Sequence, residues 1–227
     1  MSRTSRVFIV LALGVIGLVP ASAAAQTSIV GSKHDLSTAA TPEPCVFCHT
    51  PHGASTTLNV PLWNRRNDVT TFTPYTSKSM DTQCPATPSA YSLACLSCHD
   101  GVNISGAMNS KHDLIVGPGG TVPDTTSNPE CARCHPEYYG GPEVRWIGTD
   151  LRNDHPISMT YPTPAQDPDF LTPPDLQKGW GPLAGDVKLF NGKVECPTCH
   201  NVHNPSVKPF LRKSNANDGL CKTCHIK

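Results

Sequence analysis

The sequence predicts a mostly irregular chain, coil with a few short helices and one small hairpin, that wraps bound groups more than it packs against itself. Its 227 residues include 23 prolines and only 6% aromatic residues, which disfavours long helices and a wide sheet. Ten of the 11 cysteines fall in five copies of Cys-x-x-Cys-His. About 40 residues of chain per copy is too little to build a separate domain around each.

The repeated motif is typical of covalent haem attachment. The two thiols add across the vinyl groups of a haem, and the histidine binds the iron from one face. Each Cys-x-x-Cys-His copy is called a clip here, numbered first to fifth along the chain. A zinc ion would need two clips to supply four ligands, and five clips cannot pair evenly. A thioredoxin-like site needs one clip and no histidine after it. The predicted haem-attaching residues are Cys45, Cys48, Cys95, Cys98, Cys131, Cys134, Cys196, Cys199, Cys221 and Cys224, and the predicted proximal iron ligands are His49, His99, His135, His200 and His225.

Five further histidines match the five irons in number. If all of them bind, each iron has two histidine ligands and no vacant position, which favours electron transfer over catalysis. Any one of them could instead be a surface residue, with Met80, Met108 or Met159 as the axial ligand. We therefore expect an electron carrier without catalytic residues. The predicted distal ligands are His34, His52, His112, His155 and His203.

The local sequence narrows what each distal histidine does. His52 and His203 come three residues after a proximal histidine, on the same side of that haem, so we expect them to ligate neighbouring haems. His34 and His112 lie in a repeated Ser-Lys-His-Asp-Leu segment that precedes an attachment motif, which indicates a duplicated ligand segment. The aspartates next to these two histidines and to His155 are candidate acceptors for the ring N–H.

The N-terminus predicts export. Arg3 and Arg6 precede an apolar run over 7–19 and an alanine-rich stretch, so residues 1–25 read as a secretory signal peptide, cleaved there or two residues earlier. No later stretch approaches the roughly 20 apolar residues of a membrane helix. We expect residues 26–227 to form a pentahaem domain in the periplasm or outside the cell.

The formal net charge is zero, and no basic stripe with interleaved aromatic residues is present, which argues against nucleic-acid binding. Cys84 lies outside the five motifs and is either an ordinary buried thiol or one half of an intermolecular disulfide. Because haem faces would supply most of the apolar core, the haem-free chain is expected to be disordered.

Turn and cap patterns predict a few local elements. Residues 187–190 and 193–196 flank Asn191-Gly192, a two-residue turn, and form the predicted hairpin. Asn217-Asp218 offers a cap for one short helix carrying the fifth clip. The proline-broken segment 161–182 is predicted to be loop. The long segments without a clip, expected to wrap the haems, are 54–94 and 141–195.

Several of these segments resemble bacterial multihaem cytochromes with doubled Cys-x-x-Cys-His motifs. Within that group the chain is similar to extracellular cytochromes that polymerise into conductive filaments, the OmcE and OmcS type. The resemblance implies loops and short helices around a continuous stack of bis-histidine haems, in alternating parallel and T-shaped pairs. The segments that carry the resemblance are 45–53, 61–65, 93–101, 153–156 and 219–225.

The resemblance also implies a homopolymer for extracellular electron transfer, in which an N-terminal histidine ligates a haem of the next subunit. That role would fall on His34. The third attachment site departs from the four-haem members, so 101–141 is predicted to be an added haem module. The alternatives are a monomeric periplasmic electron shuttle with His34 bound within the chain, and a nitrite or hydroxylamine reductase with one open iron. Other redox proteins or extracellular acceptors are the expected partners.

Overall fold

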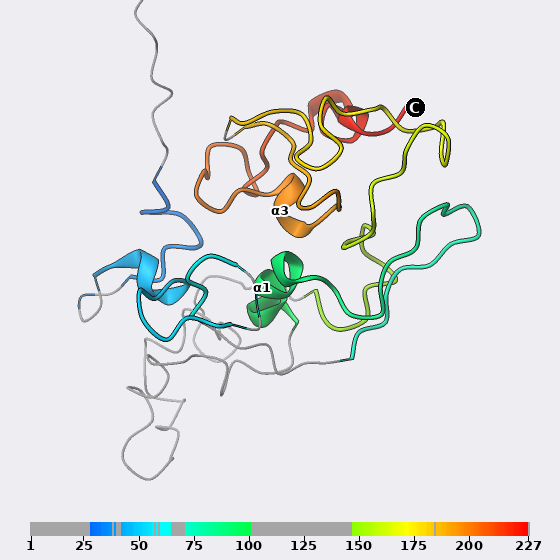
Figure 1. The fold of residues 1–227 in the computed structure, drawn as a ribbon. Helices are drawn as coiled ribbons and strands as arrows, with labels where there is room; N and C mark the ends of the chain where they lie inside the picture. The colour runs from blue at the N-terminus through cyan, green and yellow to red at the C-terminus, as the bar shows by residue number, and fades with distance from the viewer. Residues whose placement is uncertain are drawn as a thin grey trace, which may run out of the picture.

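The computed structural model describes residues 28–37, 39, 42–56, 58, 60–64, 71–100, 147–183 and 185–226 (Figure 1). The predicted signal peptide lies outside these residues, as do His112, Cys131, Cys134 and His135 of the predicted added module. The described chain is mostly irregular, as predicted, and contains no strand. Its helices are all short: η1 (Pro44–Phe47), α1 (Ala90–His99), α3 (Cys196–Cys199), η3 (Ala216–Asp218) and η4 (Cys221–Thr223).

The longest helix, α1, carries the second clip and was not predicted from the sequence. It starts after Ser89, which is extended with φ −76° and ψ 167°, and its ten residues contain neither proline nor glycine. Alanine and leucine favour the helix, and Leu96 is completely buried. The helix places both cysteines of the second clip on one side, a turn apart.

The predicted hairpin forms only at its turn. Phe190 and Lys193 exchange backbone hydrogen bonds of 3.0 and 3.2 Å around Asn191 and Gly192, whose φ values are +54° and +73°. The two arms then separate, because each finds a different backbone partner. Residues 187–189 bond to 178–180, whereas Val194 N–H donates to the Met159 carbonyl at 3.0 Å. The hairpin prediction is therefore wrong beyond the turn, while the segment 161–182 contains no helix or strand, as predicted.

The cap of the C-terminal helical segment differs from the predicted one. Asn215 Oδ1, two residues upstream of the predicted cap, accepts the N–H groups of Leu220 and Cys221 at 3.1 and 3.4 Å. Asn217 and Asp218 instead have positive φ values, 53° and 60°, and form the bend before η4. The fifth clip therefore begins on a turn that an asparagine side chain closes.

The apolar core of the described residues is small and divided. One cluster contains Met159, Tyr161, Leu189 and Val194, and the other contains Phe72, Leu96 and Leu151. Between these clusters α1 packs against α3, so that two clip-bearing helices lie side by side near the centre (Figure 1).

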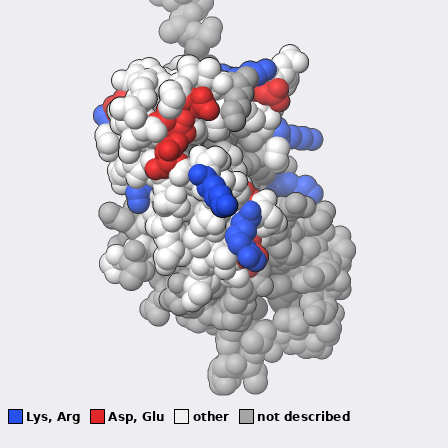
Figure 2. All heavy atoms as spheres, turned by 90° about the vertical axis from the view of Figure 1, so that its right-hand side faces the viewer, with Lys and Arg blue, Asp and Glu red and all other residues white. Residues whose placement is uncertain are grey.

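The surface carries charges of both signs in small separate groups, and the face in Figure 2 shows no continuous basic stripe. Among the described residues, no helix has the length and apolar character needed to cross a membrane.

Replacing Gly179 with alanine should destabilise the fold through a backbone clash. A Cβ there would lie 2.7 Å from both the Leu189 nitrogen and the Val187 oxygen, at φ +90°. We expect a loss of about 2 to 4 kcal/mol in the free energy of unfolding. Gly31→Ala is the matched control, because φ is +76° but no atom lies within 4 Å of the added Cβ. Chemical denaturation measures both, and equal losses would contradict the clash.

Candidate haem-ligating histidine pairs

The four described clips share one backbone shape, a single helical turn. In three of them the histidine N–H donates to the carbonyl of the first cysteine. These bonds are His49 to Cys45 (2.9 Å), His200 to Cys196 (3.1 Å) and His225 to Cys221 (2.9 Å). The second clip lies inside α1 and has the same turn. A helical turn brings the two thiols of each clip to one side, as attachment to one porphyrin edge requires.

Three clip histidines each face a histidine from a distant part of the chain. The ring centroids of His34 and His99 are 6.1 Å apart, and those of His155 and His225 are 6.4 Å apart. His49 and His203 are 6.2 Å apart, with ring planes only 20° from parallel. A metal bound between two imidazole nitrogens, at about 2 Å from each, places the ring centres about 6 Å apart.

The histidine pairs fit a haem better than a bare metal ion. The described residues contain no group of three or more histidine, cysteine or acidic side chains that could hold a metal. Each pair supplies two nitrogen donors, and a porphyrin supplies the four that complete an octahedron. The buried Nδ1 of His34 also lacks a hydrogen-bond partner among the described residues, as expected where a partner comes from outside the polypeptide.

Backbone carbonyls of proline fix the ring orientation of three histidines. A carbonyl only accepts hydrogen bonds, so Nδ1 must carry the proton, which leaves the lone pair of Nε2 for metal. The bonds are His49 Nδ1 to Pro61 O (3.0 Å), His200 Nδ1 to Pro209 O (3.0 Å) and His155 Nδ1 to Pro156 O (2.9 Å).

The suggested aspartate acceptors are wrong for His155 and for Nδ1 of His34. The ring of His155 bonds to its own following proline, and Asp154 Oδ2 has no partner among the described residues. The Asp35 carboxylate accepts from the N–H groups of Gly31 and Ser37, at 2.7 and 3.1 Å, instead of from Nδ1 of His34. Short side chains next to a histidine in sequence bond the local backbone more readily than the ring.

The first and fourth clips belong to two copies of one structural module, residues 45–64 and 196–212. In each copy a returning segment pairs antiparallel with the residue after the second cysteine, as His49 with Trp63 and His200 with Leu211. The matching hydrogen bonds are Thr50 N to Leu62 O (2.8 Å) and Asn201 N to Phe210 O (2.7 Å), then Asn64 N to Cys48 O (3.0 Å) and Arg212 N to Cys199 O (2.8 Å).

The two modules also share an unusual backbone conformation. The residue after the ring-binding proline has a positive φ in both copies, 54° at Leu62 and 62° at Phe210. This conformation is uncommon for residues other than glycine and costs about 1 kcal/mol or more. In each copy a side chain then donates to the carbonyl of the residue after the first cysteine, from Asn64 Nδ2 and from Arg212 Nε at 2.6 Å. The duplication is thus one of geometry, which the dissimilar sequences of the two copies conceal.

Two of the distal histidines are held neutral at physiological pH, the form that binds iron. Burial, followed by the neighbouring His99, His200 and His203, lowers the pKa of His34 to about 4. Partial burial and the neighbouring His49 lower the pKa of His203. Neutral imidazole keeps the lone pair that a metal needs.

The second and fourth clips lie in direct contact. The neighbouring thiol of Cys196, together with burial, raises the pKa of Cys95. Ser92 Oγ, one turn before Cys95, accepts the Cys196 N–H at 3.1 Å. The ring of His34 also packs against Phe210 of the fourth-clip module, with centroids 4.6 Å apart. Haems on these two clips would therefore be near neighbours.

The other predicted residues, which are His52, two methionines and Cys84, take no part in the three histidine pairs. His52 is exposed and makes no ring contact with a clip histidine that resembles the three pairs. Met159 and Met80 pack in the apolar cluster around Tyr161. Cys84 packs against the same cluster, where burial raises its pKa, as an ordinary half-buried thiol would.

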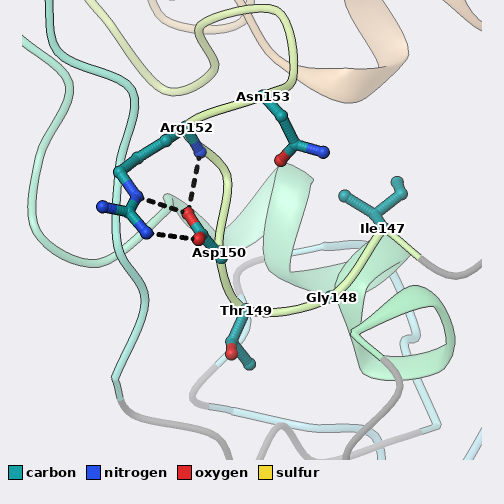
Figure 3. Close-up of a pocket in the computed structure, with 6 residues that line it drawn as sticks. All are labelled: Ile147, Gly148, Thr149, Asp150, Arg152 and Asn153. Atoms are coloured by element: carbon teal, nitrogen blue, oxygen red, sulfur yellow. Dashed lines mark hydrogen bonds and ion pairs between the residues drawn. The ribbon is translucent and has the colours of Figure 1, made fainter.

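A surface hollow of about 650 Å³ lies beside the second clip but does not resemble a ligand site (Figure 3). Its floor is tied to α1, because the N–H groups of Ile147 and Gly148 donate to the His99 carbonyl at 2.8 and 3.1 Å. Asp150 and Arg152 form a two-pronged ion pair at 2.8 and 2.6 Å, and the arginine lowers the pKa of Asp150 to about 2. Both side chains are more than half exposed, so the pair contributes little.

No family model and no curated protein matches the sequence. Function is therefore inferred from the attachment motifs and from the geometry of the histidine pairs.

Removing the ring of His203 should leave the first haem with one histidine. In His203→Ala we expect about one fifth of the ferric haem to become high-spin, because His203 is the ring that faces His49. Electron paramagnetic resonance of the oxidised protein measures the fraction. Asn204→Ala, in the same loop, is the control and should leave all the haem low-spin. A fully low-spin His203→Ala protein would show that His49 has a different partner.

Proposed function

We propose that the protein transfers electrons through covalently attached c-type haems, each with two histidine ligands. The observation that carries the proposal is the set of three ring pairs, His34 with His99, His49 with His203 and His155 with His225, at 6.1 to 6.4 Å. Each pair joins a clip histidine to a distal histidine chosen from the sequence by count alone. The haem, when bound, supplies the one-electron iron couple, and the chain supplies its position, ligands and exclusion of water.

The duplicated module points to a candidate partner for the fourth haem. His203 of the second copy faces His49 of the first, three residues after its own clip. A reciprocal exchange between the two copies would assign His52, at the matching place in the first copy, to His200, and would require the exposed ring of His52 to move, since it does not lie against His200 in the structure. Two copies that exchange equivalent residues have the self-complementary geometry of a twofold contact.

Two-histidine ligation favours an electron carrier over a reductase. A reductase needs an iron with an open or exchangeable position, and each of the three histidine pairs would supply ligands to both faces of a bound iron. The electron donors and acceptors are then other redox proteins or extracellular acceptors. The protein would meet them outside the cytoplasmic membrane, because its N-terminal sequence predicts export.

The position of His34 favours a carrier that is complete within one chain. In a filament of the kind that the resemblance implies, His34 would ligate a haem of the next subunit. In the structure its ring lies 6.1 Å from His99 of the same chain and packs on Phe210. We therefore place the shuttle ahead of the filament.

The purified native protein should weigh about 3 kDa more than its polypeptide, because five haems add by thioether bonds without loss of atoms. Intact mass spectrometry measures this excess. Near-infrared magnetic circular dichroism should show bands of two-histidine haem only, and the reduced protein should bind much less than one equivalent of carbon monoxide. Absence of the mass excess would end the proposal, and stoichiometric carbon monoxide binding would favour a reductase.

His34→Ala separates the shuttle from the filament. Within one chain, losing the ring that faces His99 should make one haem high-spin and leave the particle mass unchanged. Light scattering and negative-stain microscopy of the secreted protein measure the assembly. Lys33→Ala, which changes the exposed neighbour, is the control for the segment. Filaments of the native protein that fall apart in His34→Ala would instead establish ligation between subunits.

A further inference from the structure

Glu195 is a buried acidic side chain at the contact between the second and fourth clips, and the haem-ligating scheme does not use it. Only 1% of its surface is exposed. It directly precedes Cys196, the first residue of α3. Burying a carboxylate is costly unless hydrogen bonds or a countercharge compensate for lost water. The groups around Glu195 must therefore replace the water that its carboxylate has lost.

Hydroxyl groups surround the carboxylate. Ser89 and Ser92 donate to Oε1 and Oε2, and Ser158 donates to Oε2 at 2.8 Å. The start of α3 adds a backbone donor in a capping box with Thr198. Among the described residues, no lysine, arginine or histidine lies within 4 Å of this carboxylate. Hydrogen bonds from neutral donors stabilise the ionised form of a carboxylate, and a charge in a buried place is poorly screened.

The charge lies next to the attachment points of two haems. Ser92, which binds Glu195, is one turn before Cys95, and Glu195 is joined to Cys196 by a peptide bond. The Cys196 N–H also donates to Ser92 Oγ at 3.1 Å, so the start of the fourth clip lies against α1. Thioether bonds from the sulfurs of Cys95 and Cys196 would place both porphyrin edges beside the same carboxylate.

We propose that Glu195 is a positioning and tuning residue that lowers the reduction potentials of the second and fourth haems together. Adding one electron converts iron(III) to iron(II) and removes one positive charge from the haem. A fixed negative charge nearby stabilises the oxidised form more than the reduced form, and net charge and burial are established determinants of haem potentials. The three serines orient the carboxylate, and Ser89 and Ser92, at the start of α1, hold that helix against the start of α3. This inference rests on the proposed haem attachment.

The test compares two isosteric substitutions in the full-length holoprotein. Glu195→Gln removes the charge and keeps the shape, so two of the five midpoint potentials should shift upward in a mediated spectroelectrochemical titration. Glu43→Gln is the matched control, because Glu43 also stands just before a clip but is solvent-exposed. Water screens an exposed charge, so its five potentials should stay in place.

Ser89→Ala should shift the two midpoint potentials in the opposite direction to Glu195→Gln. It therefore distinguishes an effect of charge from a general loosening of the structure. It removes one hydroxyl donor from the carboxylate and leaves the charge, so the same two potentials should shift downward. A purely structural role would loosen the contact in both variants and move the potentials in one direction. No shift in Glu195→Gln, or shifts of equal sign in both variants, would overturn the inference.

Haem content separates this inference from the proposed function. Intact mass and the two-histidine spectral bands of each variant report whether all five haems are attached and ligated. Full attachment with unmoved potentials would reject the role of Glu195 and leave electron transfer standing. If Glu195→Gln does not accumulate, the sign of the shift in Ser89→Ala alone decides.

Discussion

The constraint on which the rest of the structure depends is the pairing of one clip histidine with one histidine from far along the chain. A metal between two imidazoles fixes the distance and direction of both rings, and a clip fixes the same haem by two covalent bonds. In the proposed function each haem would thus join two segments that the backbone alone would not hold together. The pairs close loops of about 65, 70 and 150 residues.

This constraint explains how a chain with so little apolar core keeps a defined shape. Closing loops of this length removes roughly 4 to 5 kcal/mol of unfolded-state entropy per cross-link in the simplest treatment. The described residues offer only two small apolar clusters, one of four and one of three buried residues. Haem cross-links and porphyrin faces, as proposed, would therefore take the place that sheets and long helices hold in other domains of this size. Irregular backbone is then tolerated, because the ligands set its path.

What could be predicted from the sequence follows from how local each feature is. The clip residues are visible because attachment requires them to be adjacent, and the irregular backbone follows from proline content. The Asn191-Gly192 turn was predicted correctly. The backbone partners of its two arms are residues 159 and 178–180, and no pattern in the sequence near the turn indicates them. Helix α1 was missed because the second clip was read only as an attachment motif, although Ala90 to His99 contains no helix breaker.

The candidate site shows the same limit. Counting histidines identified His34, His155 and His203 as distal candidates, and the structure places each opposite a clip. The partners could not be predicted, since nothing in the sequence relates residue 49 to residue 203. The proline carbonyls that orient His49 and His200 were also missed. The sequence signal for these carbonyls is a proline that follows the clip histidine in each module, Pro61 after His49 and Pro209 after His200. The number of residues between histidine and proline differs in the two modules, which hides the correspondence.

The arrangement of the described clips bears on how electrons would cross the molecule. The thiol of Cys196, then burial and the thiols of Cys98 and Cys48, raise the pKa of Cys95. Burial, followed by the thiol of Cys199, raises the pKa of Cys224 to about 12. Neighbouring thiols thus connect the first, second, fourth and fifth clips in that order. Because tunnelling falls steeply with distance, haems attached along this series would form a route that lies wholly within the described residues. Glu195 stands at the contact between the second and fourth clips, so a charge there would act on a step that every electron on this route would have to take.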